Sequence, residues 1–155
     1  MKSLLIAFFA FAPALAANFP TGPDSRLTTG SLCSQPDAYR YAEKIPYCNR
    51  NVDDGMKAGV IREYDQQLGY HIQQMNRQDF KIDHFFPLCA GGSNNSNNLW
   101  PQHKSVYSVT DPLEQIVCVK MEAGRLKQAD AIQILIRGKL HLDEVPELFA
   151  KVKAL

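Results

Sequence analysis

The stretch over residues 81–103 constrains the fold of this 155-residue chain more than any other. An Asp-His pair, Asp83-His84, ends a run over residues 79–83 whose alternating apolar positions predict a β-strand. A Gly-Gly pair and a Ser/Asn-rich run follow, and this composition disfavours both helix and strand. An apolar run resumes at Leu99-Trp100, and a helix is expected to begin at Pro101. The predicted order is therefore strand, long loop, short strand and helix.

This stretch resembles the ββα-metal finger of the HNH (His-Me finger) endonucleases, and among these the small secreted bacterial type. The resemblance rests on Asp-His-x-x-Pro-Leu from Asp83, Gly-Gly-Ser-Asn from Gly91 and Asn-Leu-Trp-Pro-Gln from Asn98. It is specific over residues 81–114 and weaker over 45–80. It implies an α+β fold in which a ββα-metal finger, a two-stranded hairpin plus helix, is embedded among additional helices in a disulfide-stabilised chain.

Phosphodiester hydrolysis needs an attacking water, a base for its proton and a cation for the developing charge. His84 is the candidate base because imidazole titrates near neutral pH, and Asp83 is the candidate metal ligand because carboxylates suit hard cations. Neighbours on a straight strand point to opposite faces, so both can serve one site only if the strand ends or bends at His84. The resemblance implies the same two roles. An ordinary strand-end pair is the alternative interpretation.

Two further residues complete the predicted site. Asn98 falls where the family keeps an Asn that fixes the loop between the strands, and its amide can bridge two backbone groups. The position at which many HNH sites place a later His or Asn ligand is Tyr107 here, and a neutral phenol is a poor ligand for a hard ion. We therefore expect His103, one helical turn earlier, to be the second metal ligand. A structural or phosphate-contacting role for His103 is the alternative.

The expected cofactor is one divalent metal ion, Mg²⁺ first, with Mn²⁺ or another divalent ion as alternatives. The expected partner is DNA, with RNA as a further substrate, and the chain is expected to be a monomer. Four cationic side chains are candidates for binding substrate phosphate: Arg62, Arg77, Lys81 and Lys104. An ordinary solvated surface charge is the alternative for each of them.

The first 17 residues have the pattern of a signal peptide, with Lys2, a short apolar run and an Ala-x-Ala site. The apolar run is shorter than the about 20 residues that span a bilayer, although an uncleaved anchor is the alternative. We therefore expect a periplasmic or secreted protein without a membrane segment after cleavage. Its predicted parts are an extended N-terminal arm over 18–44 and an HNH-like nuclease domain over 45–155.

Charge gives the nuclease interpretation little support. Removal of the leader takes away Lys2 and no acidic residue, which leaves 16 basic and 16 acidic side chains. A nucleic-acid binder usually carries a basic excess, so any phosphate-binding surface must be local.

Four cysteines in an exported chain predict disulfides, and four allow three pairings. We expect Cys33–Cys48 to close the N-terminal segment and Cys89–Cys118 to tie the site loop to the following helix. A zinc site made by all four thiolates is the rival interpretation, which the absence of a Cys-x-x-Cys pair disfavours.

Helices are expected from apolar periodicity and from Gly and Pro signals. Their ranges are residues 53–68, ended by Gly69; a helix opened by Asp111-Pro112 and ended by Gly124; residues 126–136, ended by Gly138; and residues 143–152. The sequence as a whole predicts a secreted metal-dependent endonuclease of low sequence specificity. The alternative is a catalytically inactive HNH-fold module that binds nucleic acid or protein.

Overall fold

The structure is a computed structural model that describes residues 18–155, so the predicted signal peptide over 1–17 lies outside the described residues. Residues 18–155 form an α+β fold of two antiparallel hairpins and four α-helices. In chain order these are β1 (Ala38–Arg40), β2 (Ile45–Tyr47), α1 (Asp54–Leu68), β3 (Phe80–His84), β4 (Leu99–His103), α2 (Lys104–Glu122), α3 (Gln128–Leu140) and α4 (Val145–Lys153). Among these residues, no helix combines the length and the apolar character needed to cross a membrane.

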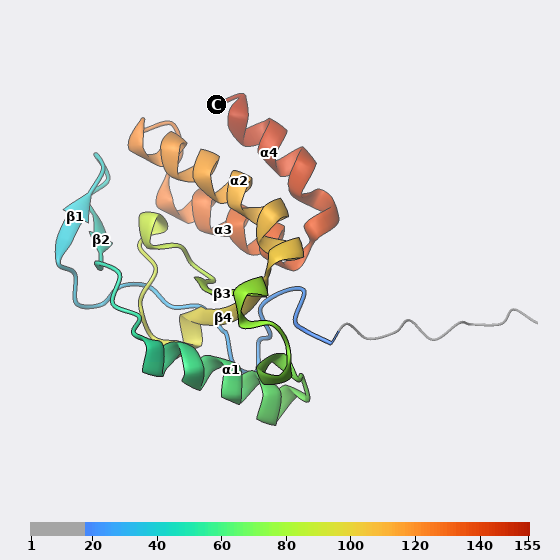
Figure 1. Ribbon diagram of the computed structural model, residues 1–155. Helices are drawn as coiled ribbons and strands as arrows, with labels where there is room; N and C mark the ends of the chain where they lie inside the picture. Colours follow the sequence, from blue (N-terminus) through green and yellow to red (C-terminus); the bar gives the residue numbers. More distant parts are fainter. Residues whose placement is uncertain (1–17) are drawn as a thin grey trace, which may run out of the picture.

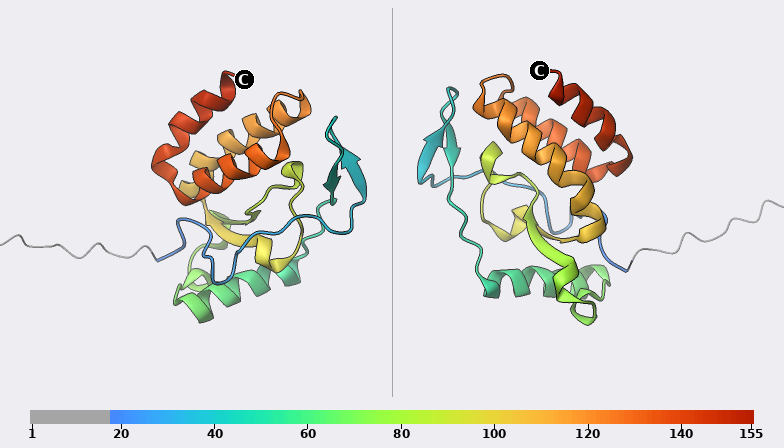
Figure 2. Two further views of the ribbon diagram at one scale, coloured as in Figure 1. Left: turned by 180° about the vertical axis from the view of Figure 1, so that it is seen from behind. Right: turned by 45° about the horizontal axis from the view of Figure 1, so that its top comes forward.

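The β3–β4 hairpin lies between α1 on one side and the layer of α2, α3 and α4 on the other (Figures 1 and 2). Each side has its own apolar core. The core beside α1 contains Val60, Ile61, Tyr64, Ile72, Phe80, Ile82, Leu99, Trp100 and Val106. The core of the helical layer contains Ile45, Ala90, Leu113, Val117, Met121, Ala131, Leu135, Val145 and Val152.

Strand β4 runs through Pro101 to His103, so the prediction of a helix beginning at Pro101 is wrong. Pro101 lies opposite Ile82 in the antiparallel register. A proline lacks the backbone N–H that an inner strand needs, but a two-stranded sheet has only edge strands and tolerates it. The consequence for the site is large, because His103 becomes a strand residue.

Helix α2 begins at Lys104, seven residues before the predicted opening at Asp111-Pro112, and contains Pro112 in its interior. The missing N–H of Pro112 removes one helical hydrogen bond. The buried face of α2 outweighs this loss, since Val106 and Thr110 before the proline and Leu113 after it are all buried.

Gly138 was expected to end the third predicted helix, but α3 continues to Leu140. The glycine is needed for close packing instead, since a Cβ atom at Gly138 would lie 2.5 Å from Leu113 Cδ2 on α2. Because α3 continues, Lys139 is a helical residue, and it is almost completely buried.

Two of the predicted helices have boundaries close to those expected. Helix α1 covers Asp54–Leu68; Asp53 caps its first turn by accepting from the Met56 N–H, and Gly69 ends it with a positive φ of 77°. The final helix α4 begins at Val145, slightly later than the range 143–152 predicts.

The N-terminal segment contacts the β3–β4 hairpin and the loop between its strands. Thr28 Oγ1 donates to the Leu99 carbonyl, and Leu32 forms an isolated antiparallel bridge with Gly92. The β1–β2 hairpin was not predicted, and it crosses the expected boundary between residues 44 and 45.

Both expected disulfides are present in the structure. Cys33–Cys48 closes the N-terminal segment, and Cys89–Cys118 joins the loop after β3 to α2. The four thiols are therefore paired with one another, and the rival zinc interpretation is wrong.

Candidate functional site

Asp83 and His84 end strand β3, but their side chains contact different partners. Asp83 lies opposite Trp100 and His84 lies opposite Leu99 in the register with β4. The strand stays regular through His84, so the alternation of side chains is retained. The strand ends at His84, which is one of the two conditions stated for a shared site, yet the Asp83 and His84 side chains share no side-chain partner.

The His84 imidazole is only 3% exposed and is held from both sides. His84 Nε2 lies 3.1 Å from Asn94 Oδ1, and Arg50 Nη1 approaches His84 Nδ1 at 3.4 Å. Since a guanidinium can only donate, Nδ1 is the acceptor and Nε2 carries the proton given to Asn94. Arg50 Nη2 also donates to the Ile82 carbonyl at 3.1 Å, and Asn94 Nδ2 donates to the Asn49 carbonyl at 2.7 Å.

The electrostatic surroundings keep His84 neutral. Burial lowers its pKa below the ordinary value, and the positive charge of Arg50 adds to this effect. The hydrogen bond to Asn94 and the charge of Asp83 act in the opposite direction without reversing the shift. An imidazole of this kind is unprotonated at neutral pH, the state that a general base requires.

Asn98 fixes the loop between the two strands, in the manner that the sequence predicts. Its side chain is fully buried; Oδ1 accepts from the Phe86 N–H at 2.9 Å, and Nδ2 donates to the carbonyls of Phe86 at 3.0 Å and Ser93 at 2.8 Å. Gly92 lies against the same turn, where a Cβ atom would come within 1.7 Å of the Phe86 carbonyl oxygen. Asn98 therefore positions the loop that carries Asn94 to His84.

Asp83 belongs to a buried network of charges on the other face of the hairpin. Lys139 Nζ lies 2.9 Å from Asp83 Oδ2 and 3.0 Å from Glu114 Oε2. Lys81 Nζ lies 3.5 Å from Asp83 Oδ1 and 2.6 Å from Asp111 Oδ1. Carboxylates and ammonium groups thus alternate in this network. Lys81 and Asp83 lie on β3, Asp111 and Glu114 on α2, and Lys139 on α3.

The pKa shifts of the two buried acids differ in direction. Burial acts to raise the pKa of Asp83, but the charges of Lys139 and Lys81 outweigh it, so the pKa lies below its ordinary value. Burial raises the pKa of Glu114, which has one ammonium neighbour at close range and the charge of Asp83 nearby. Burial would lower the pKa of Lys139, but Asp83 and Glu114 together raise it, so the ammonium stays charged.

His103 does not join Asp83 and His84. It lies opposite Phe80 at the other end of the hairpin, four strand residues from the position of His84, which corresponds to about 13 Å. Its ring stacks on Phe19 with a centroid distance of 3.9 Å, and its Nδ1 accepts from the Ser105 N–H at 3.2 Å as the cap of α2. The predicted convergence of His103 with Asp83 is absent, because β4 continues where a helix was expected.

The side chains predicted to hold a metal ion do not fit one. Both oxygens of Asp83 face ammonium groups, and His103 is bound elsewhere. Across residues 18–155, no three His, Cys, Asp or Glu side chains are arranged to surround an ion.

None of the four cations predicted to bind phosphate hydrogen-bonds to His84. Lys81 pairs with Asp111, and Lys104 pairs with Asp79 at 2.9 Å. Arg77 donates to the Phe80 carbonyl, and Arg62 lies exposed on α1. The cation that does reach the imidazole is Arg50, which sequence reasoning missed. Arg50 lies 34 residues before His84, and its sequence signal is only its position just after Cys48.

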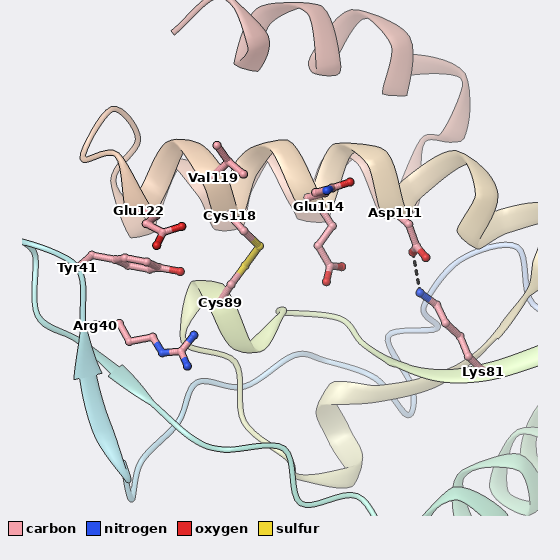
Figure 3. Close-up of a pocket in the computed structure, with 10 residues that line it drawn as sticks. Arg40, Tyr41, Lys81, Cys89, Asp111, Glu114, Cys118, Val119 and Glu122 are labelled. Carbon is pink, nitrogen blue, oxygen red and sulfur yellow. Dashed lines mark hydrogen bonds and ion pairs between the residues drawn. A yellow bond between two sulfur atoms is a disulfide. The ribbon is translucent and has the colours of Figure 1, made fainter.

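A cavity of about 920 Å³ lies on the Asp83 side, along α2. Figure 3 shows Asp111 and Glu114 facing it from α2, with Lys81 at one end and Arg40 at the other. Its lining residues include Asp111, Glu114 and Glu122 but not His84, Arg50 or Asn94. The lining carries these three carboxylates against two cations, Arg40 and Lys81, and it is separate from the His84 cluster.

Comparison with protein-family models, with curated proteins and with solved structures finds no match for this chain.

Proposed function

We propose that this chain is an exported endonuclease that hydrolyses phosphodiester bonds of DNA, and of RNA, with little sequence specificity. One observation carries the proposal. A buried neutral imidazole, His84, has its acceptor nitrogen beside the exposed guanidinium of Arg50. A base and a phosphate-binding cation therefore lie side by side, and Asn94 holds the imidazole from the opposite side.

In the proposed reaction, the guanidinium of Arg50 binds a phosphate oxygen and places the phosphorus near His84 Nδ1. A water oxygen forms a bond to phosphorus while the bond from phosphorus to the 3′-oxygen breaks. The water proton passes to Nδ1, and the leaving 3′-oxygen takes a proton from solvent. The products are a 5′-phosphate and a 3′-hydroxyl, which is the polarity that the HNH resemblance implies.

The resemblance also implies a divalent ion, which would stabilise charge on the phosphate. Asp83 and His103 do not fit such an ion, as described above, so no step of the proposed reaction passes through it. Low specificity follows from the kind of contact proposed, because phosphate contacts carry no direct information about base sequence.

A plasmid-nicking assay tests the proposal. Purified protein without its leader is incubated with supercoiled plasmid in Mg²⁺, in Mn²⁺ and in EDTA, and parallel reactions contain single-stranded DNA or RNA. We expect open-circular product in at least one condition. Intact substrate in every condition would reject the enzyme.

A second candidate is a catalytically inactive binding module. The observation that favours it is that ammonium groups hold both oxygens of Asp83, the residue that the resemblance assigns to the metal. Under this alternative the protein would retard labelled DNA in a gel-shift assay and leave its length unchanged.

A further inference from the structure

Lys139 is the most deeply buried charged side chain in the described part of the protein, with 1% of its surface exposed. A buried ammonium group costs several kcal/mol unless it is paired and hydrogen-bonded. It follows Gly138 on α3, where a Cβ atom would lie 2.5 Å from Leu113 Cδ2, so α3 lies close against α2 at this point.

Three oxygens surround the Lys139 ammonium group, each at hydrogen-bonding or ion-pair distance. They are Asp83 Oδ2 at 2.9 Å, Glu114 Oε2 at 3.0 Å and the His84 main-chain carbonyl. The ammonium group donates hydrogen bonds to Asp83 and to the His84 carbonyl, and Glu114 Oε2 is an ion-pair partner without a hydrogen bond. The arrangement brings carboxylates from β3 and α2 around one positive charge, which is the donor chemistry that a hard metal cation prefers.

Lys81 adds a second positive charge from the other side. Its ammonium group contacts Asp83 Oδ1 and Asp111 Oδ1. The two ammonium groups of Lys81 and Lys139 thus face three carboxylates, those of Asp83, Asp111 and Glu114, which leaves one negative charge in excess. A divalent ion that entered from the cavity beside Glu114 would have to displace Lys139 from Asp83 Oδ2 and Glu114 Oε2.

We infer that Lys139 is the resident cation of the Asp83–Glu114 pair, and that its ammonium group takes the position at Asp83 that the HNH resemblance assigns to a divalent metal ion. This inference rests on the contacts of Lys139 and not on the proposed hydrolysis. The same ammonium group also donates to the His84 main-chain carbonyl, which ties α3 to the end of β3.

The test measures ion binding, so its outcome is independent of nuclease activity. Free Mn²⁺ is followed by electron paramagnetic resonance while MnCl₂ is titrated into the wild-type protein, Asp83→Asn and Glu114→Gln. We expect the wild-type protein to bind no Mn²⁺ at Asp83 or Glu114 with a dissociation constant of about 1 mM or tighter. The two substitutions should therefore leave Mn²⁺ binding unchanged. One Mn²⁺ per chain, bound by wild type and lost in Asp83→Asn or Glu114→Gln, would overturn the inference.

A second variant creates the site that the inference describes. Lys139→Ala leaves Asp83 and Glu114 without their ammonium group, and we expect it to bind Mn²⁺ at least about tenfold more tightly than wild type. Saturating Mn²⁺ should raise its melting temperature by about 5 °C, while the wild-type value stays unchanged. Lys151→Ala is the matched control, because Lys151 is an exposed lysine paired with Glu147.

A folded Lys139→Ala protein that takes up no more Mn²⁺ than wild type would contradict the inference. If Lys139→Ala does not fold, the wild-type titration still decides the question, since it requires no substitution at position 139.

Discussion

Asp83 and His84 are neighbours in the chain, yet their side chains serve two separate sites on opposite faces of the β3–β4 hairpin. Asp83 pairs with Lys139 at 2.9 Å in a buried charge network, whereas His84 lies between Asn94 and Arg50. A single metal-centred site would have joined them. The structure instead separates the His84 imidazole from a group of acids that Lys81 and Lys139 partly compensate, and the predictions below concern mainly the side of His84.

Replacement of Arg50 tests the proposed phosphate contact. We expect Arg50→Ala to lower kcat/KM for plasmid nicking by about 10- to 100-fold, the range for a lost hydrogen bond to a charged group. Arg50→Lys should show a smaller loss, because it keeps the charge but not the planar fork. Arg26→Ala is the control, since Arg26 is exposed and pairs with Asp24. Equal rates for Arg50→Ala and Arg26→Ala would remove Arg50 from the site.

Replacement of Asn98 tests the role of its amide in the loop. Asn98→Ala removes four hydrogen bonds at a fully buried position and leaves backbone groups of Ser31, Phe86 and Ser93 without these partners. We expect the free energy of unfolding to fall by about 3 kcal/mol. Asn95→Ala should change it by less than about 0.5 kcal/mol, because Asn95 is exposed. Chemical denaturation measures both, and similar midpoints for the two variants would contradict the assignment.

Several parts of the fold could be predicted because their signals are local. The cap at Asp53 and the turn at Gly69 define α1, and Asn98 stands apart from its Asn-rich neighbours because an apolar run follows it directly. The course of β4 could not be predicted in the same way. Pro101 is a helix-start signal in isolation, and only its pairing with Ile82 in a two-stranded sheet makes it a strand residue.

The missed site residues depend on contacts that are distant in the sequence. Arg50 reaches His84 across 34 residues, and Lys139 reaches Asp83 across 56 residues. Each looks like an ordinary surface cation when the sequence is read alone. Gly138 adds to the difficulty, since a glycine near the end of a helical pattern usually indicates a stop, whereas here it allows α3 to approach α2.

Removal of the Cys33–Cys48 disulfide should destabilise the protein. The bond spans 15 residues, and a loop of this size corresponds to about 3 kcal/mol of constraint on the unfolded chain. We therefore expect a Cys33→Ser, Cys48→Ser double variant to melt well below wild type, and dithiothreitol to lower the wild-type melting temperature. A melting temperature unchanged by both treatments would show that the bond does not stabilise the protein.

The pH dependence of nicking should report the lowered pKa of His84. The neutral imidazole accepts the proton, so a pKa below the ordinary value of about 6.5 extends full activity to lower pH. We expect the acid limb of kcat/KM to be centred below about pH 6.5, the ordinary pKa of an imidazole. In Arg50→Ala the acid limb should move to higher pH, because the Arg50 charge contributes to the shift. An acid limb centred above about pH 7 in wild type would contradict the assignment.

The most direct test compares His84→Ala with His71→Ala in plasmid nicking at saturating protein. His71 is an exposed histidine outside the cluster, so its replacement controls for the loss of an imidazole. We expect His84→Ala to reduce the rate by at least about 100-fold, the lower end for a general base, while circular dichroism shows an intact fold. His71→Ala should match wild type. Nicking by His84→Ala at the wild-type rate would contradict the account of this site.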